Sequence, residues 1–159
     1  MKRLIYTLLM CAGISIFPTA LQAQQLSAKR IAIIEKQIDS IFTDNLKAGE
    51  AVDMDKLAQS VDDSRKTGFI SGGAYYAAFD SLLEKVKAGK NGIARQEYVL
   101  GQKKITVLSE KDALVTASGT STLFTTSGST FSVKFAWTFV YEKINNVWKV
   151  IHSHQSAVR

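Results

Sequence analysis

The segment from Phe131 to Tyr141 constrains the fold most strongly, because its side chains alternate regularly between two kinds. Large apolar residues occupy every second position, namely Phe131, Val133, Phe135, Trp137, Phe139 and Tyr141. The positions between them include Ser132, Lys134, Ala136 and Thr138. Successive side chains of a β-strand point to opposite faces of the sheet, so the pattern predicts a strand with one face in a hydrophobic core.

The whole second half of the chain is rich in β-branched and aromatic residues, which favours strands. We predict strands at 93–108, 113–125, 130–143 and 147–157. The breaks between them are short and of the hairpin type, at 110–112, 127–129 and 145–146. A meander of long antiparallel strands is therefore expected.

The first half of the chain has helical periodicity instead. Apolar residues from Ile31 to Leu46 recur at the spacing of one helix stripe, which predicts a helix over 27–46 with Gly49 as its stop. A second, shorter helix is predicted from about Asp53, a good N-cap, to Val61.

A third helix is predicted to start after Ser71 as its cap and to end at Gly89, with Phe69 and Ile70 as a short extended link before it. Gly72 and Gly73 would open this helix. A phosphate-binding role for them is weakly supported, because no further glycine motif or lysine accompanies them. Three helices followed by a meander predict an α+β fold, with the helices covering a curled antiparallel sheet of about four to six strands.

The amino terminus has the features of a signal peptide. Lys2 and Arg3 precede an apolar run over 4–17, and cleavage is expected after Ala23. Residues 1–23 would then be removed, leaving one domain at 24–159 that is periplasmic or secreted and has no stable membrane anchor. Acylation of Cys11, as in a lipoprotein, is the disfavoured alternative because the bulky Met10 precedes it.

Composition excludes several other classes of protein. Cys11 is the only cysteine, so the predicted mature chain has neither a disulfide nor a cysteine metal cluster. The formal net charge is +6 at pH 7 and falls by two when the signal peptide leaves. Basic residues are interleaved with acidic ones, which indicates a solvated surface and no nucleic-acid partner.

The closing strand carries a resemblance to a known family. The aromatic strand 135–141 is followed by the turn Asn145-Asn146 and by a last strand from Trp148 to Ser156. This order of segments resembles the end of a nuclear transport factor 2-like domain of the SnoaL-like branch. That branch is similar to the association domain of calcium/calmodulin-dependent kinase II. The resemblance covers about 27–157. It implies a cone-shaped pocket and a homodimer formed through the outer sheet face, and its members include isomerases, cyclases, dehydratases and assembly domains.

His152 and His154 are the candidate catalytic residues. On a regular strand they would project from the same face as Trp148 and Val150, about 7 Å apart. They could bind a metal, act as acid or base, or serve as hydrogen-bonded structural residues, and the last interpretation is favoured. We predict no metal, since no third histidine or cysteine is available in the mature chain. Nothing indicates a nucleophile triad using Ser153 or Ser156.

Some members of the class that this chain resembles are steroid isomerases, but the residues present disfavour their mechanism. That mechanism needs an aspartate just after the turn that follows the second helix, and here the position falls near Thr67 or Gly68. It also needs a tyrosine on the first helix, and 27–46 contains none. Asp62 and Asp63 are therefore interpreted as a structural turn that terminates a helix.

Aromatic side chains are the other candidates for a pocket. Together with the two histidines we predict a ligand pocket from Phe69, Tyr75, Tyr76, Tyr98 and Trp137, of which two or three should line a real cavity. No cofactor is predicted. The favoured function is binding of a small apolar or amphipathic molecule. The alternatives are a cyclase, dehydratase or isomerase using His152 or His154, and an oligomeric assembly module without a ligand.

Overall fold

The computed structural model describes residues 26–158. The predicted signal peptide and Cys11 lie outside these residues. Three helices are present: α1 (Ala28–Glu50), α2 (Met54–Gln59) and α3 (Phe79–Lys90). Six strands accompany them: β1 (Phe69–Ser71), β2 (Ala74–Tyr76), β3 (Ile93–Val107), β4 (Asp112–Thr125), β5 (Thr130–Ile144) and β6 (Val147–Val158). No helix in this part of the chain is long and apolar enough to cross a membrane.

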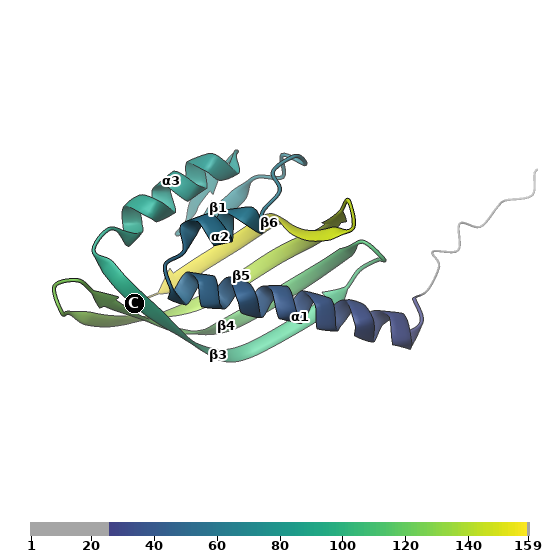
Figure 1. Ribbon diagram of the computed structural model, residues 1–159, viewed down its shortest axis with the longest axis horizontal. Helices are drawn as coiled ribbons and strands as arrows, with labels where there is room; N and C mark the ends of the chain where they lie inside the picture. Colours follow the sequence, from purple (N-terminus) through teal and green to yellow (C-terminus); the bar gives the residue numbers. More distant parts are fainter. Residues whose placement is uncertain (1–25, 159) are drawn as a thin grey trace, which may run out of the picture.

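The predicted α+β class is confirmed, and the sheet is mixed. Its strand order is β2-β1-β6-β5-β4-β3. All neighbouring strands are antiparallel except β1 and β6, which run parallel with Ile70 opposite His154. The prediction of a purely antiparallel sheet is therefore corrected at this one pair. The helices lie on one face of the sheet (Figure 1).

The helix starts follow from local capping. The Oγ of Ser27 accepts a hydrogen bond from the backbone N of Arg30, 3.2 Å away, and Asp53 caps α2 through the N of Lys56 at 2.9 Å. Both starts agree with the sequence prediction, whereas α1 continues past Leu46 to Glu50. Side-chain caps of this kind satisfy N–H groups that the helix itself leaves unpaired.

The start predicted for the third helix is wrong. Residues 69–76 form a β-hairpin in which Ser71 pairs with Ala74. Gly72 and Gly73 form its turn with φ of 57° and 80°, a backbone conformation that glycine adopts without steric cost. Because the chain leaves the hairpin extended, α3 begins only at Phe79.

The acidic turn before the hairpin supplies the missing cap of α3. Ala78, at the N-cap, makes no side-chain hydrogen bond. The cap comes instead from Asp63, which lies earlier in the sequence. Its Oδ2 accepts a hydrogen bond from the backbone N of Phe79 at 3.0 Å. Asp62 closes its own turn by accepting from the N of Ser64 at 2.9 Å. Asp62 and Asp63 thus have hydrogen-bonding roles that support the structural interpretation.

The packed core lies beneath the first two-thirds of α1, and we call this region the filled end. Its buried residues come from α1 and from the covered face of β4, β5 and β6. They are Ile34, Ile38, Phe42, Ala113, Val115, Ala117, Tyr141, Trp148 and Val150. The alternation predicted for β5 is visible in its inner positions, where Phe135 and Tyr141 are 4% and 1% exposed, while Phe131 at the strand start is 38% exposed. The covered face of β5 therefore supplies core over most of its length.

Candidate functional site

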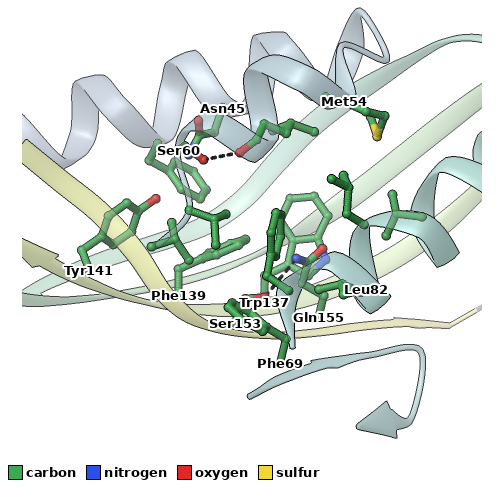
Figure 2. Close-up of a pocket in the computed structure, with 18 of the residues that line it drawn as sticks. Asn45, Met54, Ser60, Phe69, Leu82, Trp137, Phe139, Tyr141, Ser153 and Gln155 are labelled. Carbon is green, nitrogen blue, oxygen red and sulfur yellow. Dashed lines mark hydrogen bonds between the residues drawn. The ribbon is translucent and has the colours of Figure 1, made fainter. Parts of the chain in front are cut away.

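An internal cavity of about 140 Å³ lies beyond the filled end, between the carboxyl-terminal part of α1, α2, α3 and the strands β5 and β6. Figure 2 shows the side chains that surround it. Those labelled there are Asn45, Met54, Ser60, Phe69, Leu82, Trp137, Phe139, Tyr141, Ser153 and Gln155. Most of the wall is apolar or aromatic, as is usual in small-molecule sites. We call this space the inner chamber.

Aromatic rings of β5 form the floor of the inner chamber. The ring of Trp137 stacks on that of Phe135 with centroids 3.9 Å apart. Tyr98 and Phe139 meet Trp137 edge-on, at 5.2 and 6.1 Å between centroids. Neighbouring strand β4 is paired with these large residues through Ala117, opposite Trp137, and Gly119, opposite Phe135. The small residues of β4 leave room for the rings, which hold one another in place.

The hydroxyl of Tyr141 is buried, and within residues 26–158 it makes no hydrogen bond of ordinary geometry, although the side chain of Asn45 is close enough to influence it. It points toward the side of the chamber that α1 covers (Figure 2). Burial raises the pKa of Tyr141 above its ordinary value, and the nearby amide of Asn45 offsets part of that rise. A buried hydroxyl without a partner is costly to the fold, so this one is available to a bound molecule.

A second space of about 460 Å³ adjoins the first, and we call it the outer chamber. The two chambers share lining residues, including Met54, Tyr98, Trp137 and Gln155. Its other walls come from the β1–β2 hairpin, α3 and the far ends of β3 to β6. The shared residues make the outer chamber a route to the inner one.

A polar network lies where α1, α3 and β3 meet at the outer chamber. Gln96, which is 3% exposed, donates from Nε2 to the carbonyl of Gly49 at 2.6 Å and to the hydroxyl of Tyr98. The Nζ of Lys90 donates to the Oε1 of the same Gln96. Glu50 accepts from the backbone N of Tyr98 at 3.2 Å. The amide of Gln96 thus links the ends of two helices to the sheet.

Ionisable groups are few in the chamber walls. Among the described residues, the lining of both chambers includes no histidine, aspartate or glutamate, and its only lysines are Lys85 and Lys90. Burial raises the pKa of Tyr98, which keeps its hydroxyl neutral. The walls can therefore donate hydrogen bonds, and their two lysines can attract an anion.

His152 and His154 do not lie on the face that the strand pattern predicted. The pairing of β5 with β6 shifts between Tyr141 opposite Val150 and Val140 opposite His152, which leaves Ile151 as a bulged residue. A bulge of one residue exchanges the two faces of a strand. Ser153 and Gln155 consequently line the inner chamber, while the two histidines project from the opposite face.

Each histidine has a different environment. The Nδ1 of His152 lies 2.7 Å from the carbonyl oxygen of Gly68, and its ring stacks on Phe69 with centroids 6.4 Å apart. His154 is exposed and borders a broad depression of the outer face together with Thr138 and Ser156. The hydrogen bond of His152 ties the turn before β1 to the sheet, as a structural histidine would.

The remaining predicted pocket residues divide between the chambers and the surface. Phe69, Tyr98 and Trp137 line the inner chamber, Tyr76 lines only the outer one, and Tyr75 is 66% exposed. Sequence reasoning missed the polar lining residues, chiefly Asn45, Ser60, Gln96, Ser153 and Gln155. Tyr141 was also missed as a pocket residue, although its place in the alternating strand put it on the same face as Trp137.

Comparison with known protein families identifies the family of this chain. The sequence matches the family described as calcium/calmodulin dependent protein kinase II association domain over residues 27–159. The chain belongs to this family. The association domain fold accounts for the helices packed on one face of the sheet, and it agrees with the resemblance seen in the closing strands. No curated protein matches the sequence significantly.

Solved structures agree with the fold of this association domain. A nuclear transport factor 2-like superfamily protein from Salmonella enterica has a TM-score of 0.70 at 18% identity, covering 80% of this chain and 93% of that one. The association domain of CaMKII from C. elegans gives 0.63 at 14%, covering 79% and 96%. A nuclear transport factor 2-like protein of unknown function from Shewanella oneidensis gives 0.59 at 21%, covering 77% and 98%. At these identities the likeness establishes the fold alone.

Proposed function

We propose that this association domain binds one small, largely apolar molecule in the inner chamber, with the hydroxyl of Tyr141 as its hydrogen-bonding contact. The observation that carries the proposal is an aromatic cavity with a buried hydroxyl that makes no hydrogen bond of ordinary geometry to the described residues. The apolar run at the amino terminus supports export of the chain, so the molecule would be met outside the cytoplasm.

The volume of the inner chamber limits the size of the molecule. A cavity of about 150 Å³ lined by leucine, isoleucine and phenylalanine holds benzene. The inner chamber, at about 140 Å³, matches one ring or a short alkyl chain. A longer molecule would extend past Trp137 into the outer chamber.

Binding is favoured over catalysis because of where the histidines lie. The enzyme hypothesis needs His152 or His154 as acid or base inside the pocket. Both are on the opposite face of β6, and the described chamber walls contain no carboxylate that could replace them. The enzyme hypothesis therefore loses the histidine that it needs inside the pocket as acid or base.

Two matched probes test the binding proposal. Phenol has a hydroxyl that can pair with Tyr141, whereas toluene has the same ring and no such group. In Tyr141→Phe we expect phenol to bind about 3- to 10-fold more weakly and toluene to bind as before, because one neutral hydrogen bond is lost. Affinities are measured by NMR titration. Equal phenol affinity in both proteins, or failure of both probes to bind, would contradict the proposal.

Stability measurements separate this role from a structural one. Since the hydroxyl of Tyr141 makes no hydrogen bond of ordinary geometry within residues 26–158, Tyr141→Phe should change the free energy of unfolding in urea by less than about 1 kcal/mol. Native mass spectrometry of protein purified from its own host would then identify the natural ligand by its mass. If the purified protein is empty and also fails to bind the ring probes, the hypothesis of an assembly module without a ligand is favoured.

Self-association is the second candidate function, and the family description of an association domain supports it. The outer face of β4, β5 and β6 is broad and carries small side chains such as Ala136, Thr138 and Ser156. Small side chains allow two sheets to approach closely. Sedimentation equilibrium tests this proposal, and replacing the exposed Ala136 by arginine should shift a dimer to monomers.

A further inference from the structure

Lys90 is half-buried at the end of α3, and it lines the outer chamber. Within the described residues it forms no ion pair, and its one hydrogen bond goes to the neutral amide of Gln96. Burial without a counter-ion lowers the pKa of Lys90 from its ordinary value. An anion placed beside this ammonium group would be held more strongly than at a fully solvated lysine.

Tyr98 adds a second donor at the same place. Its hydroxyl accepts a hydrogen bond from the Nε2 of Gln96, so its own proton remains to be donated elsewhere. Its ring lines both chambers. Lys90 and Tyr98 are bridged by one glutamine side chain, which fixes the two donors relative to each other.

The acidic groups near this point are already engaged. Asp55 pairs with Lys87 at 3.0 Å, and Asp53 caps α2. Glu50 accepts from the backbone N of Tyr98, and it also raises the pKa of that tyrosine. None of these carboxylates lines either chamber. The charge of Lys90 is therefore left for a bound molecule.

We propose that the ligand is an amphipathic carboxylate, with its apolar part in the inner chamber and its carboxylate held by Lys90 and Tyr98 in the outer one. This inference rests on the proposed function and names the ligand class. The geometry orients the molecule, because the aromatic floor and Tyr141 lie at one end of the joined chambers and Lys90, the half-buried one of the two lysines in their described walls, lies at the other.

The test uses phenylacetate, 3-phenylpropionate and 4-phenylbutyrate, each compared with its matching primary alcohol. Calorimetric titration should show at least one carboxylate binding about tenfold more tightly than its alcohol, since hydrogen bonds to charged groups are the stronger ones. Lys90→Met should bring the two affinities to about the same value, and Lys90→Arg should retain most of the preference. Lys87→Met is the control, because Lys87 lies on the same helix but lines neither chamber.

The outcomes distinguish this inference from the proposed function. Alcohols that bind as tightly as carboxylates in the unaltered protein would overturn the anion site and leave the apolar pocket standing. A preference that persists in Lys90→Met would also overturn it. If neither series binds, and phenol and toluene also fail, the pocket proposal falls with it. The comparison in the unaltered protein needs no variant, so it decides even if Lys90→Met does not fold.

Discussion

The two ends of the helix-covered face differ in how they are packed. At the filled end, Ile34 and Ile38 of α1 are 0% exposed and lie directly on the sheet. At the other end, which we call the hollow end, α1 faces the sheet with Asn45, Ala48 and Gly49, and the inner chamber begins. The roof there consists of α2 and α3 (Figure 1), and the β1–β2 hairpin extends the edge of the sheet beside β6.

The size of the residues on α1 explains this difference. One helix crosses both ends, but its inward positions change from isoleucine and phenylalanine to small or polar residues. A β-carbon at Gly49 would come within 2.9 Å of the hydroxyl oxygen of Tyr98, so this position has no room for a side chain. The side chain of Tyr98 occupies the space beside Gly49, next to the inner chamber. Packing thus fills one end and leaves a cavity at the other.

The largest expected loss of stability comes from a substitution in the core of the filled end. Ile34→Ala should lower the free energy of unfolding by about 2–5 kcal/mol, because it opens a cavity at a position that is 0% exposed. The adjacent Ile33→Ala is the control at 41% exposed, and its cost should stay within about 1 kcal/mol. Urea unfolding measures both. Equal losses would show that α1 does not pack on the sheet with this face.

The next effect concerns the floor of the hollow end. Gly119→Ala should cost about 1–3 kcal/mol, since the new β-carbon would collide with the carbonyl oxygen of Val99 and lie 2.9 Å from Cζ of Phe135. Gly101→Ala on the neighbouring strand is the control, because its closest contact would be at an ordinary 3.5 Å. Thermal unfolding compares the two. A milder change at Gly119 than at Gly101 would argue against the close pairing of β3 and β4.

A smaller effect is expected in the roof. Asp63→Ala removes the acceptor for the N of Phe79 and should cost about 0.5–2 kcal/mol, the usual range for a lost helix cap. Asp63→Asn keeps an acceptor oxygen and should lose less. The exposed Asp80, in the first turn of the same helix, provides the control as Asp80→Ala. Hydrogen exchange of α3 reports the change, and unaltered exchange in Asp63→Ala would refute this capping role.

The smallest effect depends on pH. The guanidinium of Arg65 donates to Glu142, with Nε 2.8 Å from Oε2, and this hydrogen bond holds the pKa of Glu142 below its ordinary value of 4.5. A lowered folded-state pKa gives stability that is present above about pH 4.5 and is lost as the pH falls through the folded pKa. The gap in urea midpoint between the unaltered protein and Glu142→Gln should therefore narrow on acidification. A constant gap would contradict this coupling.

Much of the fold could be predicted because its signals are local. Alternation in β5, the caps Ser27 and Asp53 and the hairpin breaks each depend on residues a few positions apart. The third helix was predicted too early because Gly72 and Gly73 are compatible with a helix start as well as with a turn. The pairing of β1 with β6 favours the turn over the helix start. The two paired strands are far apart in the sequence, so no local pattern shows the pairing.

The candidate site was harder to predict than the fold. Phe69, Tyr98 and Trp137 were predicted as pocket residues because they are aromatic, and they line the inner chamber. His152 and His154 were placed on the wrong face because a bulge at Ile151 gives no clear local signal. The same bulge brought Ser153 and Gln155 inward, where they had not been expected.

The sequence by itself determined the α+β class, most element boundaries and the family, since these depend on periodicity and on residues close together in the chain. Only the tertiary structure decided which side chains meet in the chambers. Gln96 joins Gly49, Lys90 and Tyr98 from three separate elements, and the buried hydroxyl of Tyr141 makes no hydrogen bond of ordinary geometry within residues 26–158. Burial and hydrogen bonding between distant segments arise only when the helices pack on the sheet, so no local pattern records them.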